Sequence, residues 1–243
     1  MSAGLLLVGG SGTRLLPLTR HTSKHLLRVG GRPMVHHSLD TLVRAGCDSI
    51  RLVCNPGDEH AYLQALDVPR YAHCHFSVTV QPRPGGIAQA VALAADHCED
   101  GVVVGLGDNL LHGAGASSFL ADFRASSGAM LVTCRVADPR DYGVAEVDGS
   151  GRVRSLEEKP AHPRSDRAIV GLYALDGTVV ERVRGLTPSP RGELEMVDLL
   201  DRYRQDDALR AVALPEDVVW MDLGTHEALA RADALLAEAQ PSS

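Results

Sequence analysis

Short apolar runs alternate with segments of helical spacing from the start of the chain to about residue 136, and this alternation strongly limits the possible folds. The predicted strands lie at Ala3–Gly9, Ile50–Cys54, His75–Val80, Val102–Leu106 and Ala129–Val136. The predicted helices lie at Met34–Ala45, Asp58–Leu66, Gly86–Cys98 and Ala116–Ser126. Strands and helices that alternate in this way form a mostly parallel sheet wrapped by helices. We therefore expect an α/β fold.

The pattern changes after Val136. Two short alternating runs, Gly143–Val147 and Arg152–Leu156, flank the turn sequence Asp148-Gly149-Ser150-Gly151, which predicts a hairpin. The later predicted elements are strand Ala168–Leu175, helix Glu193–Gln205, strands Leu209–Leu214 and Val218–Leu223, and helix Thr225–Gln240 with Thr225 as N-cap. We expect one domain over residues 1–243, with a small antiparallel addition packed against the main sheet.

The charge pattern argues against nucleic acid and membrane partners. The chain has 24 Lys and Arg against 31 Asp and Glu, a formal charge of −7, and the charges are scattered. The apolar runs are too short to span a bilayer, and no basic stretch precedes the first one. Five cysteines without a C-x-x-C pair fit reduced thiols. We expect a cytoplasmic protein that holds any anionic ligand at a local basic site.

Lysine is rare in this chain: 22 of the 24 basic residues are Arg, and only Lys24 and Lys159 are Lys. Lysine is a compact point charge, whereas arginine is a broad planar fork, so a tight phosphate site can accept one and reject the other. Chance survival on a solvated face is the other interpretation. Asparagine is equally rare and occurs only at Asn55 and Asn109.

The first strand is followed by the glycine-rich sequence Gly9-Gly10-Ser11-Gly12-Thr13-Arg14. In an open α/β sheet, ligands bind at the carboxyl ends of the strands, so this loop is well placed for a nucleotide. The glycines let backbone N–H groups turn toward an anion, and Arg14 supplies positive charge. The spacing matches neither a P-loop nor G-x-G-x-x-G. The loop continues for about two dozen residues and contains Lys24, which favours a binding role.

Several motifs then follow one another along nearly the whole chain. The first are Leu7-Val8-Gly9-Gly10-Ser11-Gly12-Thr13-Arg14-Leu15, Pro17-Leu18-Thr19, Ser23-Lys24 and Arg32-Pro33-Met34. The later ones are Gln81-Pro82-Arg83-Pro84-Gly85-Gly86-Ile87-Ala88-Gln89-Ala90, Leu106-Gly107-Asp108-Asn109, Tyr142-Gly143-Val144, Leu156-Glu157-Glu158-Lys159-Pro160, Gly171-Leu172-Tyr173, Arg191-Gly192-Glu193-Leu194-Glu195 and Trp220-Met221-Asp222-Leu223-Gly224-Thr225-His226. Together they resemble the sugar-1-phosphate nucleotidylyltransferases, and among these the glucose-1-phosphate thymidylyltransferases.

The resemblance implies a Rossmann-like, mixed and mostly parallel sheet with a small antiparallel sugar-binding addition. It places a nucleotide-binding part at about residues 1–136, a sugar-phosphate-binding part at about 137–225 and a C-terminal helix at 225–240. The implied reaction is attack by a phosphate oxygen of a sugar 1-phosphate on the α-phosphorus of a nucleoside triphosphate, with dTTP favoured and pyrophosphate released. Since the attacking monoester is already largely a dianion, the site needs cations and positioning rather than a general base.

The resemblance also implies residue roles. Arg14 and Lys24 would hold the triphosphate, Lys159 and Arg191 would hold the sugar phosphate, and Asp108 and Asp222 would bind Mg²⁺, these six forming the catalytic set. The nucleotide-binding set is Leu7, Gly9, Gly10, Ser11, Gly12, Thr13, Gln81, Pro84, Gly86 and Gln89. The sugar-phosphate-binding set is Leu106, Tyr142, Gly143, Glu158, Lys159, Ile169, Gly171, Arg191 and Trp220. Mg²⁺ also fits hard carboxylate and phosphate oxygens.

The sequence departs from the family pattern at a few positions. These are Val8 in place of Ala, His25, Arg28 near a usual Pro, and Leu111-His112 in place of aromatic residues. The chain resembles the short form of the family, without a C-terminal extension that contributes to an allosteric site, so we expect little inhibition by end product through such a site. A homo-oligomer, either dimer or tetramer, is also expected.

Other interpretations stay open. The same chemistry could use UTP or CTP, or another sugar or cyclitol 1-phosphate. A catalytically silent nucleotide-sugar-binding subunit is a second class, which the joint presence of Arg14, Lys24, Asp108, Lys159 and Asp222 disfavours. A glycosyltransferase of similar sheet topology is disfavoured because Leu106-Gly107-Asp108-Asn109 is not an Asp-x-Asp motif.

Overall fold

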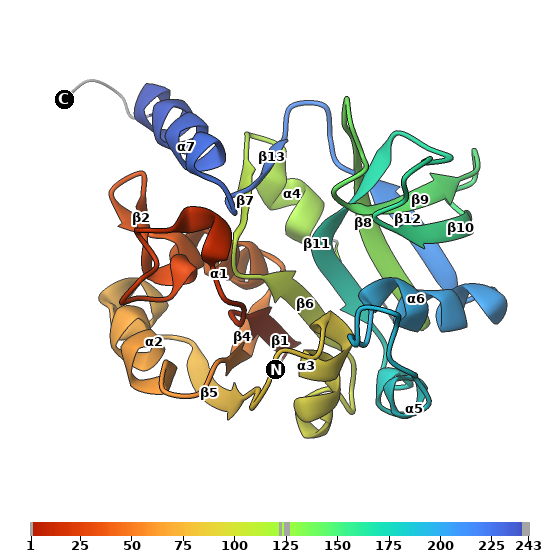
Figure 1. Ribbon diagram of the computed structural model, residues 1–243, viewed down its shortest axis with the longest axis horizontal. Coiled ribbons are helices and arrows are strands. Elements are labelled where there is room, and N and C mark those ends of the chain that lie inside the picture. Colours follow the sequence, from red (N-terminus) through yellow and green to blue (C-terminus); the bar gives the residue numbers. More distant parts are fainter. Residues whose placement is uncertain (1, 122, 124–126, 240–243) are drawn as a thin grey trace.

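The computed structural model describes residues 2–121, 123 and 127–239. The central layer is a nine-stranded sheet in the order β10-β9-β11-β6-β1-β4-β5, with β8 paired to β11 and β12 paired to β8 (Figure 1). Its strands are β1 (Ser2–Leu7), β4 (Cys47–Cys54), β5 (His75–Val80), β6 (Val102–Leu106), β8 (Ala129–Arg135), β9 (Gly143–Val147), β10 (Val153–Glu158), β11 (Arg167–Leu175) and β12 (Leu209–Ala213). Strands β6, β1, β4 and β5 run parallel, and β11, β9 and β10 run antiparallel to their neighbours. The predicted mixed sheet is therefore confirmed.

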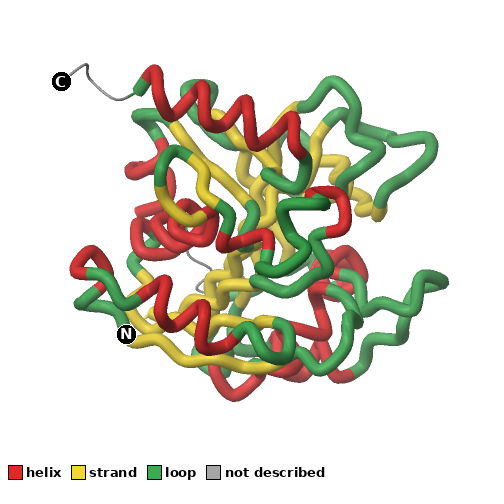
Figure 2. Tube along the Cα trace, turned by 60° about the vertical axis from the view of Figure 1, so that its left-hand side comes forward, coloured by secondary structure: helices red, strands yellow, loops and turns green. Residues whose placement is uncertain are grey.

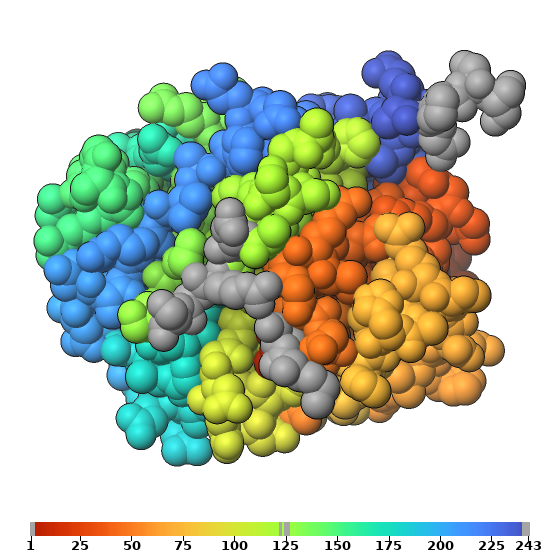
Figure 3. Space-filling model, turned by 180° about the vertical axis from the view of Figure 1, so that it is seen from behind, coloured from red at the N-terminus to blue at the C-terminus, as the bar shows by residue number. Residues whose placement is uncertain are grey.

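Helices cover both faces of this sheet (Figure 2). One face packs against α1 (Met34–Arg44), α2 (Glu59–Leu66) and α4 (Ala116–Ala121), and the other against α3 (Ile87–Leu93), α5 (Val179–Arg184) and α6 (Met196–Gln205). Two hydrophobic cores result, one on each side, because the central strands carry buried apolar residues on both faces. From behind, the orange-to-yellow part of the chain and the green-to-light-blue part lie side by side, and the dark blue end lies against the first part (Figure 3).

A third, smaller core lies under α7 (His226–Glu238), which begins after Thr225. The Thr225 hydroxyl accepts a hydrogen bond from Ala228 N at 3.2 Å, so the predicted N-cap is confirmed. Buried Leu15, Leu110 and Leu229 join this core, which ties the first loop to the end of the described chain. A short hairpin, β2 (Arg28–Val29) and β3 (Arg32–Pro33), lies next to α7 (Figure 1).

A two-stranded antiparallel sheet that the sequence pattern did not predict connects two distant motifs. It pairs β7 (Asn109–His112) with β13 (Val219–Asp222), and Asp222 is the register partner of Asn109. The backbone N–H of Leu223 also donates to the carbonyl of Asp108 at 2.8 Å. As a consequence, the two predicted metal ligands, 114 residues apart in the numbering of the chain, lie on neighbouring strand ends.

Several predicted boundaries were wrong. The helix expected at Gly86–Cys98 ends at Leu93 and continues as a 3-10 turn, Ala95–His97, where His97 Nε2 contacts the carbonyls of Gly4 and Ser49. These tertiary contacts take the segment out of the helix. The helix expected at Glu193–Gln205 begins at Met196. Helix α5 was not predicted, and of the expected helix Ala116–Ser126, residues 122 and 124–126 lie outside the described residues.

Smaller differences concern strand ends. The first strand ends at Leu7 instead of Gly9, the second begins at Cys47 instead of Ile50, and the hairpin's second strand runs to Glu158. Two 3-10 turns, Thr13–Leu15 and Lys24–Leu26, interrupt the long first loop. Across residues 2–121, 123 and 127–239, no helix is both long and apolar enough to cross a membrane.

Candidate active site

A cleft of about 1250 Å³ opens where β1 and β6 end and is closed on its other side by β9, β11 and the loop before α6. Most of the predicted site residues line it, and they come from both predicted parts of the chain: Leu7, Gly9, Gly10, Arg14, Lys24, Gln81, Pro84, Gly86, Leu106, Asp108, Tyr142, Gly143, Glu158, Lys159, Ile169, Gly171, Arg191, Trp220 and Asp222. A smaller pocket of about 140 Å³ shares Arg14 and Lys24 with the cleft and adds Ser11, Gly12 and Thr13. Gln89 lies behind Gln81, whose Nε2 donates to Gln89 Oε1 at 2.9 Å.

The glycine-rich loop turns sharply at two left-handed residues, Gly10 with φ 114° and Gly12 with φ 61°. A Cβ on Gly12 would lie 3.0 Å from the Thr19 side chain, so this position needs glycine for its conformation and for space. The Thr19 hydroxyl donates to the Gly12 carbonyl at 2.8 Å and holds the turn in place. The loop thus presents backbone N–H groups beside two cations, Arg14 and Lys24.

Lys24 and Asp108 form an ion pair at the base of the cleft, with 2.5 Å between Nζ and Oδ2. Burial is the largest single influence on Asp108 and opposes its ionisation, but the charge of Lys24, the nearby His25 and the hydrogen bonds to the carboxylate together hold its pKa below the usual value. Asp222 behaves in the opposite way, since burial and then the charge of Asp108 raise its pKa. The backbone N–H of Gly224 donates to Asp222 Oδ1 at 2.8 Å. Lys24 is thus paired directly with Asp108, whereas Lys24 and Arg14 only partly oppose the rise in the pKa of Asp222.

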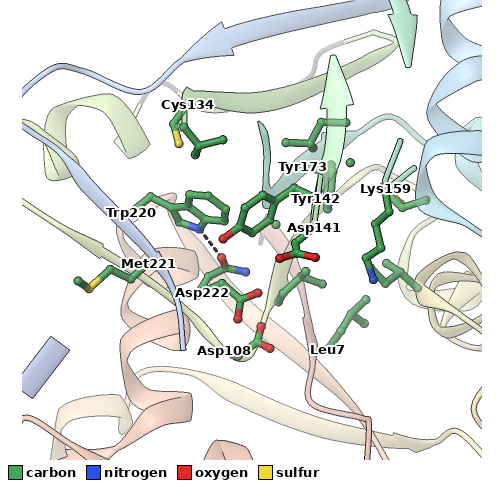
Figure 4. A pocket seen from close by; sticks show the side chains of 18 of the residues that line it. Leu7, Asp108, Cys134, Asp141, Tyr142, Lys159, Tyr173, Trp220, Met221 and Asp222 are labelled. Carbon is green, nitrogen blue, oxygen red and sulfur yellow. Dashed lines mark hydrogen bonds between the residues drawn. The ribbon is translucent and has the colours of Figure 1, made fainter. Parts of the chain in front are cut away.

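This pair fits a magnesium ion. The two carboxylates point into the same space (Figure 4). Within the described residues, no group of three or more His, Cys, Asp and Glu side chains is arranged to hold a metal, so further ligands would come from phosphate oxygens and water. Magnesium sites built from one or two carboxylates and substrate phosphates have this composition. Asp108 and Asp222 would hold the ion.

His25 lies buried next to the ion pair. Burial, followed by the nearby Lys24 charge, lowers its pKa to about 3, so the imidazole is neutral near pH 7. Its Nδ1 lies 3.2 Å from Ser23 Oγ and 3.1 Å from the hydroxyl of Tyr62, which donates to the Val8 carbonyl at 2.9 Å. This network connects the Lys24 turn to the end of β1.

The side of the cleft predicted to bind the base contains Gln81 and Gly86. Gln81 Nε2 donates to the Gly86 carbonyl at 3.2 Å. Gly86 has φ 93°, and a Cβ there would lie 2.3 Å from the Leu194 carbonyl oxygen. Leu194 N donates to the Gly85 carbonyl at 2.8 Å, and Ala88 N donates to the Leu194 carbonyl at 3.1 Å. The loop that carries Arg191 is thus attached by backbone bonds to the predicted base-binding loop.

The side predicted to bind the sugar phosphate is rich in carboxylates around its cations. Arg191 lies 2.7 Å from Glu193, 3.2 Å from Glu195 and 3.7 Å from Glu158. Lys159 has a left-handed backbone, with φ 45°, and its Nζ is 3.9 Å from Glu158. Burial is the main cause that raises the pKa of Glu158, and Glu195 adds to it, although Lys159 and Arg191 oppose the shift.

Aromatic side chains close the upper wall. The Tyr142 and Trp220 rings meet edge to face with centroids 5.2 Å apart, and Trp220 Nε1 donates to Asn109 Oδ1 (Figure 4). Such an edge-to-face pair presents a rigid apolar surface with a polar edge. The chain contains one tryptophan, so its fluorescence reports directly on this wall.

The sequence interpretation gave no role to Asn109, Asp141, Glu193 and Glu195, which line the cleft, or to Asn55, which bonds to the glycine-rich loop. The two asparagines could have been singled out, because they are as rare as the two lysines: the chain contains only these two. Glu193 and Glu195 belong to one of the quoted motifs, but at the start of the predicted helix Glu193–Gln205 they were taken for ordinary first-turn acids.

An α/β sheet with a glycine-rich loop at its strand ends, and with Asp108, Asp222 and several cations around one cleft, is typical of enzymes that bind nucleotides and transfer phosphate-containing groups. Sequence comparison identifies the family: the chain belongs to the nucleotidyl transferase family, whose sequence model matches residues 3–239.

Curated relatives include a glucose-1-phosphate thymidylyltransferase from Mycobacterium tuberculosis (strain ATCC 25618 / H37Rv), 39% identical over 227 residues, which cover 93% of this chain and 79% of the relative. A glucose-1-phosphate thymidylyltransferase from Neisseria meningitidis (serogroup A / serotype 4A, strain DSM 15465 / Z2491) is 38% identical over 98% of this chain and 83% of its own length.

Solved structures agree with this family. A structure from Bacillus anthracis, described as a glucose-1-phosphate thymidylyltransferase in complex with a sucrose, has a TM-score of 0.88 and 33% identity, over 100% of this chain and 98% of that one. A UDP-glucose pyrophosphorylase complexed with UDP-glucose has a TM-score of 0.87 over 99% of this chain and all of its own, at 20% identity, and shares the fold.

Proposed function

We propose that this protein transfers a thymidylyl group from dTTP to glucose 1-phosphate, giving dTDP-glucose and pyrophosphate. The observation that carries the proposal is the cleft itself, in which Arg14, Lys24, Asp108 and Asp222 meet Lys159 and Arg191 across one cavity. The substrate pair follows from the relatives, which are glucose-1-phosphate thymidylyltransferases by name.

The chemistry follows from the charges. Two anions, a triphosphate and a sugar monophosphate, must approach each other, and electrostatic neutralisation with fixed orientation supplies most of the rate gain in such transfers. Arg14, Lys24 and the loop N–H groups would hold the triphosphate, with the nucleotide part at about residues 1–136. Lys159 and Arg191, in the part at about residues 137–225, would hold the attacking phosphate opposite the leaving pyrophosphate. Asp222 is the exception to this division, since β13 brings it to Asp108.

A bound magnesium ion on Asp108 and Asp222 would neutralise phosphate charge. The chain's own groups do the rest. Gln81 can donate to and accept from a pyrimidine base, Glu158 can accept from sugar hydroxyls, and the Tyr142–Trp220 wall can pack against the sugar ring. No general base is needed, because the attacking oxygen already carries negative charge; the neutral, buried His25 fits this.

The test is pyrophosphate release by the purified protein with Mg²⁺, using dTTP, UTP, CTP, ATP and GTP, each with a panel of hexose and cyclitol 1-phosphates, and products identified by mass. Release that is strongest with dTTP and glucose 1-phosphate is the expected result. Strongest release with another pair would keep the chemistry and replace the substrate. Binding of nucleotide without release for any pair would support a silent subunit.

Two further proposals concern the cellular location and the oligomeric state of the protein. We expect the protein in the cytoplasm and assembled as a dimer or tetramer. Light scattering on the eluted protein checks the assembly, and a single peak at the mass of one chain, 25.9 kDa, would contradict it.

A further inference from the structure

Asn55 directly follows β4 and makes two hydrogen bonds to one residue of the glycine-rich loop. Its Oδ1 accepts from the N–H of Gly10 at 3.1 Å, and its Nδ2 donates to the carbonyl of Gly10 at 3.0 Å. A side-chain amide offers a donor and an acceptor on two separate atoms, whereas an ionised carboxylate has no donor and a hydroxyl has a single oxygen for both roles. Asn55 therefore holds both backbone groups of Gly10 at once.

Gly10 needs such support. It has φ 114°, and a Cβ built on it would meet nothing within 4 Å. Open space thus lies where a side chain would stand, and glycine itself allows many backbone conformations. The two bonds from Asn55 restrain the backbone at this position.

The orientation of one peptide plane follows from these bonds. The Gly10–Ser11 peptide is trans, and in a trans peptide the C=O and N–H point in opposite directions. Because the Gly10 carbonyl points at Asn55, the N–H of Ser11 points away from it. Ser11 lines the small pocket with Gly12, Thr13, Arg14 and Lys24. Within the described part of the chain, no hydrogen bond occupies the Ser11 N–H.

We propose that Asn55 is a positioning residue for the triphosphate, an inference that rests on the proposed function. It acts through Gly10: it uses the Gly10 N–H itself and turns the next peptide, so that the Ser11 N–H is directed at a phosphate oxygen. This role explains why one of the two asparagines of an asparagine-poor chain stands here. Among the described residues, Asn55 lines neither pocket, so we assign it an indirect role through Gly10 rather than a contact with the phosphates.

The test measures each substrate separately in Asn55→Ala. We expect KM for dTTP to rise about five- to tenfold, in line with the loss of one or two hydrogen bonds to the loop. KM for glucose 1-phosphate should stay at the wild-type value. Calorimetric titration of dTTP alone, without sugar phosphate, should show the same factor in Kd.

A second variant separates orientation from bulk. Asn55→Asp keeps an acceptor for the Gly10 N–H, loses the donor to the Gly10 carbonyl and adds a negative charge near the triphosphate. We expect weaker dTTP binding than in Asn55→Ala, and higher salt should reduce the part of the loss that comes from charge. An Asn55→Asp variant that binds dTTP as tightly as wild type would overturn the proposal.

The control is Ser155→Ala, which removes the hydrogen bond from Ser155 Oγ to Glu146 on the β9–β10 hairpin. It should leave both KM values unchanged. If Asn55→Ala lowers the unfolding midpoint and shifts both KM values by one factor, or shifts neither, Asn55 only stabilises the fold and the inference is wrong. Failure of the proposed function looks different, since wild-type protein would then neither bind dTTP nor release pyrophosphate.

Discussion

On the nucleotide side of the cleft, Lys24 is paired with Asp108, and the two side chains are only 14% and 15% exposed. On the sugar-phosphate side, Arg191 is 42% exposed and lies within ion-pair distance of Glu158, Glu193 and Glu195, while Lys159 is 50% exposed. Charges shielded from water interact strongly and hold a fixed geometry, whereas exposed, shared pairs are weak and screened by salt.

The difference indicates what each side does before a substrate arrives. The nucleotide side is arranged in advance, by the buried pair, the His25 network and the Asn55 bonds to Gly10. On the sugar side, Arg191 is held by carboxylates and, in the proposed function, would exchange them for a phosphate when the substrate binds. The two sides are linked by the backbone bonds between Leu194 and the Gly85–Ala88 segment. We therefore expect mutations on the two sides to differ in size and in salt dependence.

The largest effect is expected from Asp108→Asn, which removes the charge from the prearranged side. Lys24 loses its ionic partner, and the magnesium site loses one of two carboxylates. We expect kcat/KM for pyrophosphate release to fall roughly 10²–10³-fold, the size seen when one preorganised electrostatic group is removed. Normal turnover of Asp108→Asn in Mg²⁺ would remove this carboxylate from the reaction.

The second effect tests the link between the sides. In Gly86→Ala the new methyl group would lie 2.3 Å from the Leu194 carbonyl oxygen, so the Arg191 loop must move. We expect KM to rise for both dTTP and glucose 1-phosphate, about tenfold, since such a clash combined with φ 93° costs on the order of 1–3 kcal/mol.

Gly31→Ala is the matched control for this change. Gly31 also has a positive φ, 80°, but a Cβ there meets nothing within 4 Å. It should lower stability slightly and leave both KM values near wild type. If Gly86→Ala raises KM for dTTP alone, Gly86 serves only the base and the link carries no coupling.

The third predicted change is a smaller one, and it lowers a KM instead of raising it. Glu193→Gln removes the carboxylate nearest to Arg191, at 2.7 Å, and leaves the arginine freer to bind phosphate. Because the pair is exposed, we expect KM for the sugar phosphate to fall only about two- to fivefold at low salt, with the gain shrinking as salt increases. Initial rates at two ionic strengths measure it. A rise in KM would mean that Glu193 orients Arg191 for the substrate.

Features set by local sequence could be predicted for this molecule, whereas features set by contacts between distant segments could not. The alternation of apolar runs and the order of the motifs were enough for the sheet and for most residues of the cleft, because those signals are local. The pairing of β7 with β13 was missed, since its partners are far apart in the chain and Asn109–His112 has only four residues. The helix predicted from Glu193 begins at Met196, because the N–H of Leu194 donates to the Gly85 carbonyl and the carbonyl of Leu194 accepts from the Ala88 N–H. A local sequence pattern cannot predict hydrogen bonds of this kind between distant segments.

The smallest effect concerns stability on the sugar side. Burial raises the pKa of Glu158 above its model-compound value of 4.5, so the folded protein holds this proton more tightly than the unfolded chain does. For a raised carboxyl pKa, the contribution to stability is greatest at low pH and declines as pH rises from about 4.5 through the folded pKa, because the folded state then binds more protons than the unfolded state. Glu158→Gln carries no such charge. We expect its unfolding temperature to exceed that of wild type at pH 8, and the difference to shrink toward pH 4.5, while KM for the sugar phosphate rises. Melting curves at several pH values, with Glu193→Gln as the exposed control, test this prediction. A difference in unfolding temperature that does not change with pH would show that Glu158 ionises as it would in water. The interior of the sugar side would then be as well solvated as its exposed cations.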